Sequence, residues 1–172
     1  MTSLAEHLTT YARAHRDRRN IATHCVGIPM IVLALLVGLN LVSVPLAGIP
    51  LSAAALLAIA VCAYWVRLDP PLGIAMALVM FLLYALASEA TARLGFGGAL
   101  GLAALLFVLG WALQFWGHWF EGVRPAFMDD IRQLLIGPIF VAAEIAFLLG
   151  MRRELQQTIE AQAGPTVARR GR

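Results

Sequence analysis

The chain has 172 residues, of which 60% are hydrophobic and 13% are charged. Soluble domains usually carry about 25% charged residues, so this composition excludes an ordinary soluble domain and predicts an integral membrane protein. The net charge of +3 comes from thirteen basic residues, all of them arginine and gathered near the two ends, which favours anionic lipid headgroups over a nucleic acid partner.

The first predicted element is a short helix over residues 2–20, with Leu4 and Leu8 on an apolar face and charged residues elsewhere. Such a helix suits the membrane surface, and we expect it to lie there. The first membrane span is expected over residues 28–46, with Pro29 in its first turn, where a missing N–H matters least.

Three stretches without charged side chains, at 25–66, 72–88 and 94–117, supply the membrane spans. A bilayer core takes about 20 apolar residues per helix, so the first stretch fits two spans and each of the others fits one. The predicted order is an uncharged turn over 44–50, a span ending near Val66, a turn over 67–71, a span over 72–87, a connection over 89–98 and a span over 99–116.

A last apolar stretch over residues 134–151 has Pro138 near its start and Glu144 in its middle. A carboxylate inside a bilayer is costly, and we expect this stretch to dip into the membrane or pack without crossing it. The fold class is therefore an all-α polytopic membrane helical bundle of four spans plus a fifth apolar segment, re-entrant or spanning. We expect a single membrane-embedded catalytic domain over 1–155 and a polar, partly disordered tail over 156–172.

The histidines that flank these spans are expected on one side of the membrane. His15 and His24 precede the first span and His118 follows the fourth, so an even number of crossings separates them. Of the arginines before residue 152, all except Arg93 fall on this side as well, and by the positive-inside rule the side is cytoplasmic. The inference requires that residues 25–66 form two spans.

The spacing of these residues predicts a split metal site. His118 and Glu121 are three residues apart and share one helix face. His15 and His24 are nine residues apart, on opposite faces of a continuous helix, so they can meet only if the chain bends between them, which we expect within residues 16–20. Three imidazoles with a carboxylate and open coordination positions suit zinc, iron or manganese.

The acidic candidates for a ligand are Glu121, which we place first, and then Asp129, Asp130 and Glu144. A structural role alone is hard to assign to Glu144, because a carboxylate in an apolar stretch must be paired, protonated or functional. The expected partner of Glu144 is Arg124, Arg132 or Gln133.

Tyr11 and Asn20 each lie four residues before a histidine, on the helix face of His15 and His24 respectively. Their side chains could fix the tautomer of each ring. Alternatively, Tyr11 is an interface anchor and Asn20 is a helix cap.

Two polar motifs flank the apolar spans. The first is Tyr11-x3-His15-x4-Asn20-x3-His24-x2-Gly27-Ile28-Pro29, and the second is Gln114-Phe115-x-Gly117-His118-x-Phe120-Glu121-Gly122-x2-Pro125-Ala126-x2-Asp129-x3-Gln133-x4-Pro138-x-Phe140-x3-Glu144. Together they resemble the Mpo1-like family, whereas the spans between them match it only in being apolar.

The resemblance implies a membrane-bound iron(II)-dependent dioxygenase that removes one carbon from 2-hydroxy fatty acids by α-oxidation, with molecular oxygen as co-substrate. His15, His24 and His118 match the family's histidines and Glu121 matches its neighbouring acid, so the resemblance implies that these four residues are catalytic. We expect all four as metal ligands, with the alternative that Glu121 only orients a histidine. The residues expected next to the ligands or the substrate are Tyr11, Asn20, Arg124, Asp129, Gln133 and Glu144. Arg124 or Arg16 is a candidate to neutralise the substrate carboxylate.

The abundance of alanine, leucine, glycine and arginine without lysine resembles a high-GC bacterial protein, so we expect the bacterial plasma membrane, with the site facing the cytoplasm. A competing interpretation is a small non-enzymatic transporter or lipid-binding protein. It predicts ionisable residues at mid-membrane depth in several spans, and in this sequence only Glu144 fits. A haem protein is a third interpretation, and the oligomeric state stays open.

Overall fold

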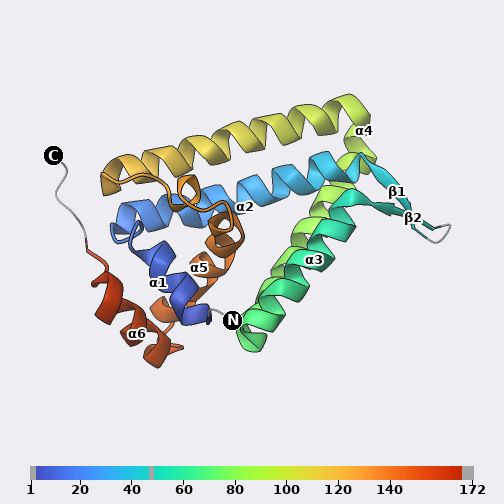
Figure 1. Cartoon of the computed structure of the whole chain (residues 1–172). Coiled ribbons are helices and arrows are strands. Elements are labelled where there is room, and N and C mark those ends of the chain that lie inside the picture. Colours follow the sequence, from blue (N-terminus) through green and yellow to red (C-terminus); the bar gives the residue numbers. More distant parts are fainter. Residues whose placement is uncertain (1–2, 47–48, 168–172) are drawn as a thin grey trace. The chain divides into compact units, whose positions relative to one another are not determined.

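The computed structural model describes residues 3–46 and 49–167. This part of the chain is helical apart from one short hairpin, which confirms the all-α class (Figure 1). The elements are α1 (Leu4–Ala12), α2 (Arg18–Asn40), β1 (Ser43–Leu46), β2 (Ile49–Ser52), α3 (Ala53–Leu68), α4 (Pro70–Glu121), the 3-10 helix η1 (Ala126–Met128), α5 (Gln133–Leu148) and α6 (Arg153–Ala163).

The chain divides into two compact units. One combines Met1–Ile28 with Ala112–Arg172, and the other comprises Pro29–Trp111. Every residue predicted for the site belongs to the first unit, and the second consists mainly of apolar helix.

Helix ends in the second unit follow local chemistry. Ser52 begins α3, because its Oγ accepts the N–H of Ala55 at 3.1 Å. Asp69 separates α3 from α4, and its Oδ1 accepts the N–H of Leu72 at 3.0 Å in the first turn of α4. The turn predicted over 67–71 is confirmed.

The stretch predicted as an uncharged turn over 44–50 contains strand residues instead. β1 and β2 pair antiparallel, with Ser43 opposite Ser52. The valine, leucine and isoleucine beside the prolines favour extended backbone, which explains why the flanks of the expected turn form strands. The centre of that turn, residues 47–48, lies outside the described residues.

Two described helices, α2 and α4, are long and apolar enough to cross a membrane, or three if α5 and α6, bent by 114°, count as one broken span. The helix α3 has 16 residues and is shorter. In the 52-residue α4 the backbone leaves helical geometry at Gly95, whose φ of 64° favours glycine. The break falls inside the connection predicted over 89–98, but the connection is a kink at one residue between two helical parts and not a loop. Four crossings are more than these helices establish.

In the first unit, α1 begins with a capping box in which Ser3 and Glu6 bond each other's backbone N–H groups. The buried face of α1 includes Leu8 and Ala12, and the helix packs on α5 and α6. The helix predicted over 2–20 is wrong in length, because α1 ends at Ala12 and the chain turns before α2 begins.

The beginning of α2 is earlier than expected. Because α2 starts at Arg18, Pro29 lies inside the helix and not in its first turn. The missing N–H removes one intrahelical hydrogen bond there, but the helix continues to Asn40. The start of the span predicted over 28–46 is therefore wrong by about three turns.

The last apolar stretch forms α5, close to the predicted range 134–151. Arg152, with a left-handed φ of 56°, then redirects the chain into the polar helix α6. Of the tail predicted to be partly disordered, residues 168–172 lie outside the described residues.

Candidate metal centre

The turn between α1 and α2 brings the two N-terminal histidines together. The Nε2 atoms of His15 and His24 lie 3.1 Å apart, and both side chains are buried. This confirms that the chain bends between them, although the bend begins at the end of α1, a few residues before the expected position at 16–20.

Backbone carbonyls hold both rings in one tautomer. The Nδ1 of His15 lies 2.7 Å from the carbonyl oxygen of Tyr11, and the Nδ1 of His24 lies 2.9 Å from that of Asn20. Because a carbonyl oxygen only accepts, each Nδ1 carries the proton and donates. The prediction that the side chains of Tyr11 and Asn20 fix the tautomers is therefore wrong: the same two residues make the contacts, but through their backbone carbonyls.

The third histidine completes the cluster. The ring of His118 lies 4.7 Å from that of His15 and 5.1 Å from that of His24, measured between centroids. One ring nitrogen from each histidine lies within 4.8 Å of the others, and all three side chains are buried. The two ends of the chain therefore supply one compact group of imidazoles.

These three rings fit a divalent metal ion. The proton on each Nδ1 leaves the Nε2 atoms of His15 and His24 as facing lone pairs, which repel unless a cation lies between them. Burial first, and His24 second, lower the pKa of His15 well below its usual value, so a proton is not that cation at neutral pH. Two imidazole nitrogens on one metal ion, each about 2.1 Å from it, lie roughly 3.0–3.4 Å apart.

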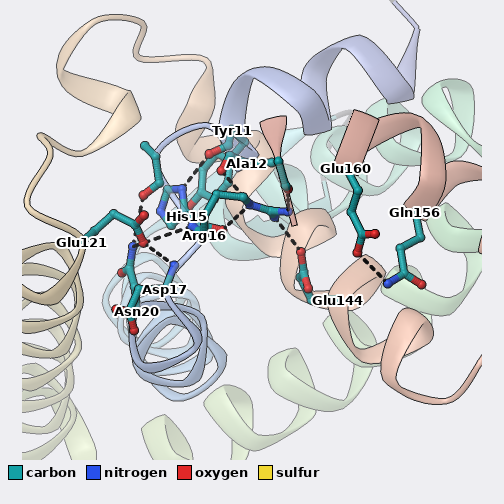
Figure 2. Close-up of polar contacts among 12 residues, drawn as sticks. Tyr11, Ala12, His15, Arg16, Asp17, Asn20, Glu121, Glu144, Gln156 and Glu160 are labelled. Atoms are coloured by element: carbon teal, nitrogen blue, oxygen red, sulfur yellow. Dashed lines mark hydrogen bonds and ion pairs between the residues drawn. The ribbon is translucent and has the colours of Figure 1, made fainter. Parts of the chain in front are cut away.

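Glu121 binds the linker between α1 and α2. Its Oε2 accepts the backbone N–H groups of Arg16 at 3.0 Å and Asp17 at 2.7 Å, and the side-chain amide of Asn20 at 3.1 Å (Figure 2). Both backbone groups directly follow His15 in the chain. Of the two roles open to Glu121, ligand or orienting residue, these contacts support the second.

Aromatic packing orients the ring of His15. Tyr11 stacks on it with centroids 4.0 Å apart and an interplanar angle of 8°, and Phe140 of α5 packs against both rings. Burial raises the pKa of Tyr11, so the phenol stays neutral. A Cβ at Gly137 would lie 3.0 Å from the Tyr11 hydroxyl, so the missing side chain gives Tyr11 its space.

The partner of Glu144 is Arg16, with 3.1 Å between Oε1 and the guanidinium Nη2 (Figure 2). The three expected partners Arg124, Arg132 and Gln133 are therefore wrong. Arg16 is buried and its Nε also donates to the carbonyl of His15 at 2.9 Å. These contacts commit Arg16 to the protein and make it a poor candidate for neutralising a substrate carboxylate.

The remaining candidates do not join the cluster. Arg124 and Asp129 are exposed, and Asp130 pairs with Arg132 near the surface. Gln133 is buried at the start of α5.

Sequence reasoning missed the buried Asp17, which pairs with Arg19 at 2.8 Å. It named Gln114 only as the first residue of the second motif; Gln114 is buried one turn before His118 on the same helix face. The four-residue spacing was the available signal for Gln114, whereas no pattern singled out Asp17 among the charges around it.

Gly117 allows α4 to approach α2 closely. A Cβ at this position would lie 2.2 Å from the Oγ1 of Thr23 and 2.4 Å from the Oδ1 of Asn20. We expect Gly117→Ala to displace His118 and to weaken metal binding about 10- to 100-fold, as changes that disturb ligand orientation do. Competition with a chromogenic chelator measures this. Gly101→Ala on the same helix, where a Cβ meets no atom within 4 Å, is the control, and equal affinities would contradict the prediction.

The fold and the cluster define a class: an apolar helical protein with a buried three-histidine site suited to a metal ion. The family described as "2-hydroxy-palmitic acid dioxygenase Mpo1-like" matches residues 1–149. The chain belongs to this Mpo1-like family, which confirms the resemblance. The match includes both sequence motifs and every residue of the histidine cluster.

Among curated proteins, 2-hydroxy-palmitic acid dioxygenase MPO1 of Saccharomyces cerevisiae is 29% identical over 162 residues, covering 93% of this chain and 89% of the yeast protein. No solved structure matches the chain. The relative is named as a dioxygenase, which supports an oxidoreductase of lipid metabolism.

Proposed function

We propose that this chain is a membrane-bound iron(II)-dependent dioxygenase that shortens 2-hydroxy fatty acids by one carbon. The observation that carries the proposal is the pair of facing Nε2 atoms of His15 and His24, 3.1 Å apart, with His118 beside them. Family membership and the name of the yeast relative supply the substrate class.

His15, His24 and His118 would hold the metal ion. Iron(II) held by these residues would supply the redox chemistry that activates dioxygen and a positive charge that attracts the oxygens of a 2-hydroxy acid. The neutral donor set leaves the positive charge of the ion available to an anionic substrate.

The surrounding residues keep the ligands in place. The carbonyls of Tyr11 and Asn20 hold the Nδ1 protons, so both Nε2 atoms point into the cluster. Glu121 holds the backbone after His15, in the manner of residues that orient metal ligands without touching the metal. The stacked Tyr11 and Phe140 cover one side of His15 and exclude water from it.

The proposed topology has four crossings, made by α2, α3 and the two parts of α4 on either side of Gly95, with α5 dipping in. Support comes from the cluster itself, since His24 near the start of α2 lies beside His118 near the end of α4. A chain that starts and ends at one membrane face crosses an even number of times. Arginine distribution supports the cytoplasmic face, and composition supports a bacterial plasma membrane.

The test is turnover by the purified full-length protein, loaded with iron(II) without oxygen and then given oxygen and 2-hydroxypalmitate. We expect a product one carbon shorter, detected by mass spectrometry, and no product from palmitate, which lacks the hydroxyl that would bind beside the carboxylate. If the iron-loaded protein shortens no 2-hydroxy acid of any chain length, the proposed function is wrong.

A further inference from the structure

The segment that follows α6 pairs with the linker that carries His15. Val167 donates its N–H to the carbonyl of Arg16 at 2.8 Å and accepts the N–H of Arg18 at 3.0 Å. This is a parallel bridge with Asp17 at its centre. The segment lies beyond residues 1–149, the part of the chain that matches the family.

The buried guanidinium of Arg16 reinforces the same connection. Its Nη1 donates to the carbonyl of Gly164 at 3.1 Å, while its Nε donates to the carbonyls of His15 at 2.9 Å and Ala12 at 3.0 Å. The ion pair with Glu144 neutralises its charge. One side chain therefore joins the C-terminal segment to the peptide group of a histidine in the cluster.

The linker needs such support because it lies between two helices and lacks the regular backbone hydrogen bonds of a helix or a sheet. Glu121 holds it by accepting the N–H groups of Arg16 and Asp17. Those contacts leave the carbonyl of Arg16 and the N–H of Arg18, which are the two groups that Val167 engages. An ordered linker is what keeps one Nε2 3.1 Å from the other.

We propose that residues 164–167 are a positioning clamp for the metal centre, holding the linker in the conformation that presents His15. The clamp acts through backbone hydrogen bonds and through Arg16 and touches neither metal nor substrate. The clamp adds a structural support to the proposed function. It rests on that function only for the statement that the ligand bound by the histidines is a metal ion. Residues 1–149, which match the family, therefore do not contain all the contacts that hold the linker at the site.

The sharpest variant is Val167→Pro, which removes the N–H that reaches Arg16, compared with Val167→Ala, which retains it. We measure hydrogen exchange of the full-length protein in detergent by mass spectrometry. In the proline variant we expect exchange in the peptide covering residues 13–18 to be about two- to tenfold faster, the effect of losing one net hydrogen bond, with the alanine variant like the natural chain. Unchanged exchange in a proline variant that retains its helical circular dichroism overturns the clamp.

A second variant covers the case in which Val167→Pro does not fold. Gly164 has a φ of 84°, and a Cβ there would meet no atom within 4 Å, so Gly164→Ala strains the backbone without a clash. Gly95→Ala places the same kind of strain, at a φ of 64°, in the other unit. We expect Gly164→Ala to make hydrogen exchange over residues 13–18 faster and Gly95→Ala to leave it unchanged. Equal exchange rates in the two variants contradict the clamp.

A spectroscopic readout separates positioning from general stability. With cobalt(II) as the probe metal, we expect Val167→Pro to alter the visible absorption bands and to release the ion about tenfold faster to a chelator, in the range for changes behind a metal ligand. Val167→Ala, which keeps the backbone N–H, should show the same spectrum as the natural protein. If the natural protein binds cobalt but shortens no hydroxy acid when it is loaded with iron(II), the proposed function is wrong and the clamp is unaffected. Identical cobalt spectra and release rates in Val167→Pro and Val167→Ala overturn the clamp.

Discussion

Replacing any one of His15, His24 and His118 by alanine should abolish stable metal binding. Each histidine is one of three buried imidazoles whose ligand nitrogens lie within 4.8 Å, and no other described histidine, cysteine or acidic side chain belongs to this group. Since loss of an orienting residue alone costs about 10- to 100-fold in affinity, loss of a ligand should cost at least 100-fold. Metal analysis of the purified variants, followed by chelator competition, measures the effect.

The fourth histidine of the chain provides the matched control for this experiment. His7 lies on α1 outside the cluster, so His7→Ala should retain the metal content of the natural protein. If all three cluster variants also retain full metal, the ion is bound elsewhere and the proposed centre is wrong. Retention by one variant alone would remove that histidine from the ligand set.

Glu121→Ala should be the most destabilising single change near the site, because it leaves three donors without their acceptor. They are the N–H groups of Arg16 and Asp17 and the amide of Asn20, all within 3.1 Å of Oε2. A buried donor left unsatisfied costs about 1–3 kcal/mol, so three such donors predict a loss of at least about 3 kcal/mol in the free energy of unfolding. Thermal denaturation in detergent measures this loss.

Glu121→Gln distinguishes the two roles left open by the sequence. The amide retains an acceptor oxygen for the linker, so the variant should lose less than half as much stability as the alanine variant and should keep its metal ion. If Glu121 were a ligand, the glutamine variant would instead fold well and lose metal. Asp129→Asn, which removes an exposed carboxylate on the loop after α4, is the control and should change neither quantity.

Sequence periodicity was sufficient to predict the meeting of the histidines. The nine-residue spacing of His15 and His24 meant that the two rings could meet only across a bend, and four expected crossings placed His118 on their side. The bend and the cluster are found, whereas the four crossings stay a prediction. Neither inference requires knowledge of side-chain packing. The bend and the cluster were therefore accessible from residue types and spacing alone.

The contacts around the cluster were not accessible in this way. Glu121 binds backbone N–H groups more than a hundred residues away, and every residue type except proline offers such groups, so no side-chain pattern predicts them. Glu144 was expected to pair with a residue of the preceding segment, namely Arg124, Arg132 or Gln133. Its partner Arg16 is far away in the chain and comes close only because α1 packs on α5. Helix docking is set by tertiary packing, which the apolar periodicity of a single sequence does not specify.

The distribution of the ligands along the chain also has a consequence for biosynthesis. About ninety residues separate His24 from His118, and at usual elongation rates the ribosome needs roughly 5–20 s to make them. During that interval the two N-terminal imidazoles have no third partner, and Glu121 and Glu144 do not yet exist to hold the linker. In the proposed metal centre, an ion would therefore be held by all three histidines only after His118 has been synthesised, and we expect a nascent chain arrested before His118 to retain no ion.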